Sequence, residues 1–185
     1  MSTISDAIKQ DHREIEEYYD KIVNSSDQDT QTRYQNLFTW ELARHSIGEE
    51  LVIYPALEKY LGDKGKQLAD RDRQEHQTVK EALYKFQGLK ANDPDFIPTL
   101  KSLMSDLSEH IKEEERDDLP GLENALASSQ DQMSEDLVKS FERTKLLVPT
   151  RSHPSAPDKP PFETVVGLMT APIDHVMDIF RKFPQ

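Results

Sequence analysis

The chain has 185 residues, which predicts one domain of ordinary size with an extension, and its 35 acidic and 23 basic residues give a formal net charge of −12. This charge argues against a nucleic-acid or anionic-membrane surface, which needs a cationic face, and the absence of cysteine excludes disulfides, iron–sulfur clusters and thiolate zinc sites. The N-terminus lacks the pattern of a secretory signal and no segment has the ~20 apolar residues that span a bilayer, so we expect a soluble protein of the cytoplasm, with the nucleus as an alternative.

The first 127 residues contain few glycines and prolines, and their apolar residues recur with the 3.6-residue period of helices. Helices with short connections bury their apolar faces most easily in an antiparallel bundle, so we expect an all-α fold built on a four-helix bundle. The four helices are predicted over residues 3–24, 30–61, 64–88 and 95–127.

Prolines predict where the helices are interrupted and how the C-terminal part of the chain is divided into segments. Pro55 and Pro120 fall inside the second and fourth predicted helices, where proline removes a backbone donor and should kink or break the helix. After the bundle domain of residues 1–127, we expect an additional amphipathic helix within 128–148, then a proline-rich linker and an apolar segment within 149–185. Pro172 is expected to start a final short helix. That segment is too apolar to remain in solvent, so it should dock on the bundle or contact a protein partner.

Each predicted bundle helix has one histidine within its apolar stripe. Two of these histidines are followed four residues later by a glutamate, and this spacing puts both side chains on one helix face. A buried polar group without a partner costs roughly 1–3 kcal/mol, and a bound cation removes that cost. The six candidate metal ligands are His12, His45, Glu49, His76, His110 and Glu114.

The second and fourth helices repeat one another. Counted from His45 and from His110, both have Glu at +4 and +5, Pro at +10, Leu at +12 and Glu at +13. The other two helices match more loosely, with an acidic residue directly before His12 and before His76. The repeat predicts a pseudo-two-fold bundle around a central pair of ions. Four imidazoles and two carboxylates suit iron, manganese or zinc, and iron is favoured where open positions face oxygen.

Other polar residues carry less weight. His153, in the proline-rich linker, and His175, on the last segment, lack a glutamate four residues later and are left out of the candidate set. Neighbouring carboxylates on a helix usually form a solvated face or pair with nearby cations. We therefore expect at most a supporting role behind the ligands for Glu50, Glu113, Glu115 and Asp72.

With these motifs the sequence resembles the hemerythrin-like, HHE cation-binding proteins over residues 1–127, and its proline-rich tail is similar to that of fungal members. The resemblance implies a four-helix bundle around a non-haem di-iron centre. It also implies a role for each candidate residue: terminal ligands at His12, His45, His76 and His110, and bridging carboxylates at Glu49 and Glu114.

The sequence departs from the oxygen-carrying hemerythrins in two places. Those proteins have a further histidine one turn before the ligand of the third helix, where this chain has Asp72, and direct binding of the metal by Asp72 is an alternative. They also have their second carboxylate as Asp at +5, whereas this chain has Glu at both +4 and +5; Glu114 is preferred because it repeats the first motif, and Glu115 is the alternative. Fewer histidines leave more open positions at the metal, which favours oxidation, sensing or redox chemistry over reversible oxygen carriage.

Three functions follow from these patterns. The first is a di-iron protein that senses or buffers iron, oxygen or a small oxidant, with manganese or zinc as less favoured metals. The second is a di-iron oxidoreductase that activates O2 or reduces peroxide or nitric oxide. The third is an interaction module whose apolar C-terminal segment binds a partner. The sequence shows neither a nucleophile constellation nor a phosphate-binding loop, so we assign no catalytic residue.

Overall fold

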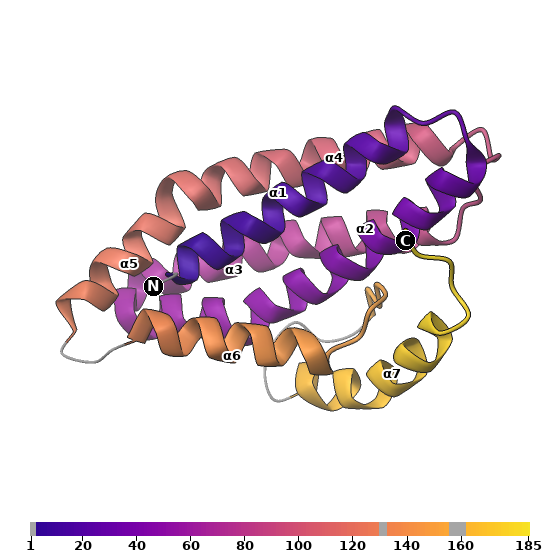
Figure 1. Cartoon of the computed structure of the whole chain (residues 1–185). Coiled ribbons are helices and arrows are strands. Elements are labelled where there is room, and N and C mark those ends of the chain that lie inside the picture. Colours follow the sequence, from indigo (N-terminus) through magenta and orange to yellow (C-terminus); the bar gives the residue numbers. More distant parts are fainter. Residues whose placement is uncertain (1–2, 130–132, 156–161) are drawn as a thin grey trace.

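The protein is described here from a computed structural model that covers residues 3–129, 133–155 and 162–185 (Figure 1). In these ranges all regular structure is helical, and the expected antiparallel four-helix bundle with a C-terminal helical extension is confirmed. The elements are α1 (Ile4–Val23), α2 (Gln28–Gly48), η1 (Glu49–Ile53), α3 (Tyr54–Gln87), α4 (Phe96–Glu113), η2 (Glu114–Asp118), α5 (Leu119–Ser128), α6 (Met133–Leu147) and α7 (Phe162–Asp178).

The first two helices begin at side-chain caps. Thr3 accepts a hydrogen bond from the backbone of Asp6, whose carboxylate in turn accepts one from the backbone of Thr3, and this capping box starts α1. Asp27 accepts from the backbone of Thr30 at the start of α2. Helices α1 and α2 therefore begin within two residues of their predicted first residues, 3 and 30.

The disturbances expected at Pro55 and Pro120 are two short π-helical turns, η1 and η2. The backbone N–H of Tyr54 donates to the carbonyl of Glu49, five residues earlier, and Leu119 donates in the same way to Glu114. Each proline then follows at the start of the next α-helix. A proline ring needs space beside the carbonyl four residues earlier, and the wider turn provides it. Both π-turns therefore begin at a candidate ligand.

The predicted break between the second and third helices lies at Gly62. Its φ of +60° is a left-handed conformation that glycine adopts without strain, and it interrupts α3. The two limbs meet closely just after the break, because a Cβ atom on Gly65 would lie 1.9 Å from the carbonyl oxygen of Leu57. The second limb of α3 is therefore the third helix of the bundle.

The apolar core is divided into two clusters with the candidate histidines between them. One cluster contains Phe38, Phe86 and Leu103, and the other contains Ile8 and Leu122. In sequence, each histidine lies between residues of the two clusters. The bundle therefore has a polar layer enclosed by apolar packing on both sides.

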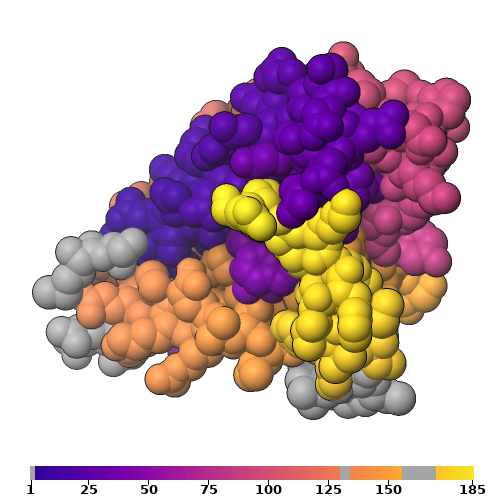
Figure 2. Space-filling view, turned by 45° about the vertical axis from the view of Figure 1, so that its right-hand side comes forward, coloured from indigo at the N-terminus to yellow at the C-terminus, as the bar shows by residue number. Residues whose placement is uncertain are grey.

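The extension lies against the bundle. Helix α6 packs on α1, α2 and η1, and Figure 2 shows the end of the chain, in yellow, lying across the bundle surface. Arg33 and Asn36 on α2 donate to the backbone carbonyls of Phe183 and Lys182. The side chain of Phe180 is 77% exposed, so the apolar surface of the tail is only partly covered.

The prediction that Pro172 starts a new helix was wrong, because α7 continues through Thr170 and Ala171 with Pro172 inside it. A single proline removes only one backbone hydrogen bond, and here it does not end the helix. Residues 156–161 of the expected linker lie outside the described residues. Among the helices that the structure does describe, none combines the length and the apolar composition needed to cross a membrane.

Candidate metal centre

The six candidate ligands lie together in the polar layer, and each is at most 3% exposed. Every bundle helix provides one histidine, and the two glutamates are the first residues of the two π-turns. The term "metal centre" denotes this set of candidate ligands: His12 from α1, His45 from α2, Glu49 from η1, His76 from α3, His110 from α4 and Glu114 from η2.

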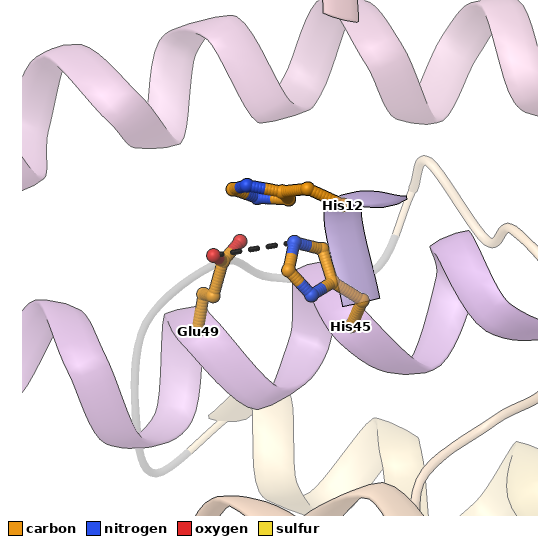
Figure 3. Close-up of side chains that lie close together, drawn as sticks. All are labelled: His12, His45 and Glu49. Atoms are coloured by element: carbon orange, nitrogen blue, oxygen red, sulfur yellow. Dashed lines mark ion pairs between the residues drawn. The ribbon is translucent and has the colours of Figure 1, made fainter. Parts of the chain in front are cut away.

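Glu49 lies between histidines of two different helices. Its Oε1 atom is 3.2 Å from Nε2 of His45, and its Oε2 atom is 3.3 Å from Nε2 of His76. Figure 3 shows the carboxylate of Glu49 beside His45, with the ring of His12 above them. Glu49 therefore belongs to two groups of potential ligands, one with His12 and His45 and the other with His76 and His110.

Glu114 contacts the histidine of α1, with its Oε2 atom 3.3 Å from Nε2 of His12. The Nε2 atoms of His76 and His110 are 3.1 Å apart. In both three-residue groups around Glu49, the potential ligand atoms lie within 4.8 Å of one another. This spacing suits two neighbouring ions that share a carboxylate.

The polar atoms of the centre are incompletely paired. Nε2 of His12, both carboxylate oxygens of Glu49 and Oε2 of Glu114 are buried and have no hydrogen-bond partner among the described residues. Buried polar atoms of this kind are usually paired, because leaving one unpaired costs about 1–3 kcal/mol. Imidazole nitrogens and carboxylate oxygens also form the donor set that iron, manganese and zinc accept. The centre therefore fits a pair of such ions.

Each histidine ring also has a carboxylate at its other nitrogen, Nδ1. The distances are 3.1 Å from His45 to Asp11, 2.7 Å from His110 to Glu75, 3.2 Å from His76 to Glu50 and 2.9 Å from His12 to Glu115. A carboxylate at Nδ1 keeps the proton on that nitrogen and leaves Nε2 free to bind a metal. The outer carboxylates, as we call them, are Asp11, Glu50, Glu75 and Glu115.

The outer carboxylates follow the sequence repeat. Asp11 and Glu75, directly before the histidines of α1 and α3, contact the histidines of α2 and α4. The two glutamates directly after Glu49 and Glu114 contact the histidines of α3 and α1. Glu115 thus lies on the outer, Nδ1 side of the His12 imidazole, and Glu114 lies on its inner, Nε2 side.

Each outer carboxylate has a cation behind it. Lys80 donates to Glu50 at 2.5 Å, and Lys145, on α6, donates to Asp11 at 2.6 and 2.7 Å. Arg13 donates to Glu115 at 2.5 Å, and Nε of Arg71 lies 3.8 Å from Glu75. These cations stabilise the ionised carboxylates, which in turn orient the imidazoles.

The pKa values of His12 and His76 are shifted in opposite directions. Burial disfavours a charged His12, but the carboxylates of Glu114 and Glu115 outweigh burial and raise the pKa of His12 to about 9. Burial lowers the pKa of His76 to about 4, although Glu50 opposes the shift. His76 is therefore neutral at neutral pH, whereas a metal ion at His12 must displace a proton.

The two inner glutamates interact strongly. Burial and the charge of Glu114 raise the pKa of Glu49 well above its usual range. Burial also tends to raise the pKa of Glu114, but the neighbouring imidazole of His12 outweighs burial and lowers the pKa of Glu114. One of two adjacent buried carboxylates thus keeps a proton unless cations are close.

Sequence reasoning missed Tyr54, which is fully buried and has its hydroxyl 2.9 Å from Nε2 of His76. Burial and the charge of Glu49 raise the pKa of Tyr54 well above its usual value, so it is a neutral phenol. The repeat contained a signal, since the equivalent residue of the other half is Leu119. A tyrosine in an apolar stripe is usually a core residue, so the sequence pattern alone does not identify Tyr54 as part of the site.

The two histidines left out of the candidate set lie in the C-terminal extension. His153 pairs with Asp174 of α7 at 2.9 Å, away from the metal centre.

Asp72 is fully buried, and one of its oxygens pairs with Arg71. Burial and the neighbouring Asp118 raise the pKa of Asp72 to about 7, although Arg71 opposes the shift.

Comparisons with known proteins agree with the helical fold and with cation binding. The family described as "Hemerythrin HHE cation binding domain" matches residues 3–122. A hemerythrin-like protein of Schizosaccharomyces pombe is 57% identical over 184 residues, which cover the whole chain and 89% of that protein. A protein of Nostoc named DNA nickase is 23% identical over 148 residues, covering 80% of this chain and 40% of its own length.

A solved structure has a similar fold. The hemerythrin HHE cation binding domain-containing protein of Mycobacterium kansasii has a TM-score of 0.63 and 22% sequence identity, over 78% of this chain and 88% of that one. The family match covers more than half of the chain, and the fungal relative is similar along the whole of this chain. The chain therefore belongs to the hemerythrin family of HHE cation-binding domains.

Proposed function

We propose that this protein binds two iron ions in the metal centre and acts in the sensing or buffering of iron, oxygen or a small oxidant. The observation that carries the proposal is the position of Glu49, whose two oxygens face histidines of two helices. One carboxylate between two sets of imidazoles is the arrangement that bridges a pair of ions. In this proposal the four histidines are terminal ligands, and Glu49 and Glu114 are the bridging carboxylates.

The residues of this chain have separate tasks in that function. The four imidazoles bind through Nε2, and the outer carboxylates orient them and keep their protons on Nδ1. The two apolar clusters keep water from the centre. Iron, when bound, supplies the redox chemistry and the affinity for oxygen. Asp72, where oxygen carriers have a further histidine, supports sensing or oxidation over reversible carriage.

The proposal extends to the rest of the chain. Residues 1–127 form the metal-binding unit, and the helix within 128–148 and the segment within 149–185 form its extension, whose apolar surface contacts a protein partner or docks on the bundle. A cytoplasmic location suits a chain without cysteine.

Electron paramagnetic resonance of the iron-loaded protein tests this proposal. Two adjacent ferric ions held by Glu49 and its neighbours would couple magnetically, so the air-oxidised protein should contain iron and give almost no high-spin ferric signal. Glu49→Gln should produce that signal, because uncoupled ferric ions are paramagnetic. Glu109→Gln is the matched control, since Glu109 is an exposed glutamate on α4 that pairs with Lys112. A strong high-spin signal in the wild type would contradict the bridged pair.

A second candidate function is a di-iron oxidoreductase that activates O2 or reduces peroxide or nitric oxide. Tyr54 favours it, because its buried hydroxyl lies 2.9 Å from Nε2 of His76 and provides a proton donor inside the centre. Turnover that Tyr54→Phe lowers while the iron content remains normal would support an enzyme. Equal consumption of oxidant by both proteins would leave the sensing or buffering role as the better description.

A further inference from the structure

The two halves of the bundle differ beside the metal centre. Asp72 lies four residues before His76, and the residue four before His12 is Ile8. Asp118 lies four residues after Glu114, and the residue four after Glu49 is Ile53. Both isoleucines are fully buried in the apolar core, and both aspartates are almost fully buried as well. One half thus has an apolar wall where the other has two carboxylates.

The two aspartates share one cation. Nη2 of Arg71 lies 2.9 Å from Oδ1 of Asp72 and 2.6 Å from Oδ2 of Asp118. The other oxygen of each carboxylate, Oδ2 of Asp72 and Oδ1 of Asp118, is buried and has no hydrogen-bond partner among the described residues. Two buried carboxylates against one guanidinium leave negative charge in a low-dielectric environment, which is unfavourable without a further cation.

These carboxylates connect the surface with the metal centre. At the surface, Glu75, Glu113 and Arg71 are each about a third exposed as side chains (34%, 39% and 36%), and Nη1 of Arg71 lies 3.3 Å from Glu113. Towards the interior, Asp72, Glu75 and His110 form a third group whose potential ligand atoms lie within 4.8 Å of one another. A line of oxygen ligands therefore leads from solvent to a histidine of the metal centre.

In the first half of the bundle, the positions equivalent to Arg71 and Glu113 have no charged side chains. Ala7 corresponds to Arg71, and Gly48 corresponds to Glu113. Gly48 lies directly under α6, because a Cβ atom added to it would be 2.7 Å from Cε2 of Phe141. Phe141 is itself fully buried and packs edge-on against His45. Helix α6 therefore covers Gly48, the position that corresponds to Glu113 in the other half.

We propose that Asp72 and Asp118 form a transit site through which ferrous iron passes from the surface into the metal centre, with Arg71 as the cation that occupies the site between passages. Carboxylate oxygens with unused lone pairs bind divalent cations and repel anions. The guanidinium of Arg71 is partly exposed, so it has room to move aside when an ion arrives. The inference rests on the proposed function, because transit requires a centre that accepts the ion.

The rate of metal loading tests this route on the full chain. Metal-free protein is mixed anaerobically with ferrous iron, or with cobalt as an air-stable probe, and loading is followed by stopped-flow absorbance until the metal content is constant. Asp118→Asn should slow loading roughly tenfold or more, because a channel lined by one sign of charge raises on-rates by that order. The final metal content should be unchanged.

Asp117→Asn is the matched control. Asp117 is the neighbouring aspartate, but it is exposed and pairs with Arg116, so its variant should load at the wild-type rate. Glu113→Gln, at the exposed end of the line, should slow loading by a smaller factor, and it tests the route even if Asp118→Asn does not fold.

Three results would overturn the inference. Wild-type loading rates in both Asp118→Asn and Glu113→Gln would show that iron enters elsewhere. Equal slowing by Asp117→Asn would indicate general electrostatic attraction to an acidic protein. Loss of one bound ion at saturation in Asp72→Asn would make Asp72 a ligand and not a transit residue. The saturating metal content of the wild type reports separately on the proposed function.

Discussion

Asp11 and His45 form a contact that extends the metal centre beyond the bundle. Oδ2 of Asp11 lies 3.1 Å from Nδ1 of His45, and both oxygens of Asp11 accept hydrogen bonds from Lys145. Lys145 is on α6, outside the residues 3–122 that match the family. The extension therefore contributes directly to the orientation of one of the four imidazoles.

Lys145→Gln should weaken metal binding on the His45 side of the centre. Without the ammonium group, Asp11 loses its cation and positions the imidazole less well, and loss of such outer contacts typically costs about 10–100-fold in affinity. Competition with a chelator measures this change. Lys139→Gln is the control, because Lys139 lies on the same helix, is exposed and pairs with Asp136. Equal affinities of the two variants would contradict the role of Lys145.

Removing one imidazole should remove metal. His45→Ala and His110→Ala should each lower the bound iron by about one ion per chain, because each leaves one position with too few ligands. His153→Ala should retain the wild-type content, since His153 pairs with Asp174 away from the centre. Metal analysis after extensive dialysis measures the difference, and unchanged content in both α2 and α4 variants would rule out the assignment.

Gly48→Ala should destabilise the protein by about 1–3 kcal/mol, as overpacking of a tight contact does. The added methyl group would lie 2.7 Å from the buried ring of Phe141, which must shift together with α6. Gly88→Ala is the control, because its Cβ would be 3.6 Å from the nearest atom, an ordinary contact. Urea unfolding of the two metal-free variants measures the stability, and equal midpoints would show that α6 does not pack closely on α2.

Metal affinity should fall as the pH drops below about 9. Burial favours a neutral His12, yet Glu114 and Glu115 outweigh burial and raise its pKa to about 9, so the metal-free ring carries a proton at neutral pH. An ion must displace this proton, and each pH unit below the pKa then costs about 1.4 kcal/mol, or tenfold in affinity.

Proton release measures this directly. Zinc added to metal-free protein near pH 7.5 in a weakly buffered indicator solution should acidify it, and His12→Ala should release fewer protons. No release from the wild type would contradict a protonated His12 in the metal-free protein.

Local sequence patterns were sufficient to predict the bundle. The apolar period identified the four helices, and the break near Gly62 and the disturbances at Pro55 and Pro120 follow from backbone properties of those residues. Pro172 was misjudged because a proline weakens a helix without always ending it. Periodicity also put the four histidines and two glutamates on inward faces, although their role as ligands stays a prediction.

The contacts around those residues could not be predicted from spacing. The pairing of Asp11 with His45 and of Glu75 with His110 depends on which helices are neighbours and on their relative height. Lys145 reaches Asp11 across 134 positions of the sequence, and no local pattern indicates this. The role of Tyr54 could not be predicted for another reason: a tyrosine on the apolar face of a helix usually packs in the core.

The iron content per chain, measured with the absorption spectrum after anaerobic ferrous loading and exposure to air, tests the central claim most directly. The account predicts about two irons per chain and new near-ultraviolet charge-transfer bands of a coupled ferric pair, as expected for a paired histidine and carboxylate site. Bands that persist when oxygen is removed would agree with oxidation or sensing, and bands that disappear would indicate reversible carriage. One iron, zinc alone or no metal in the loaded protein would contradict the di-iron centre.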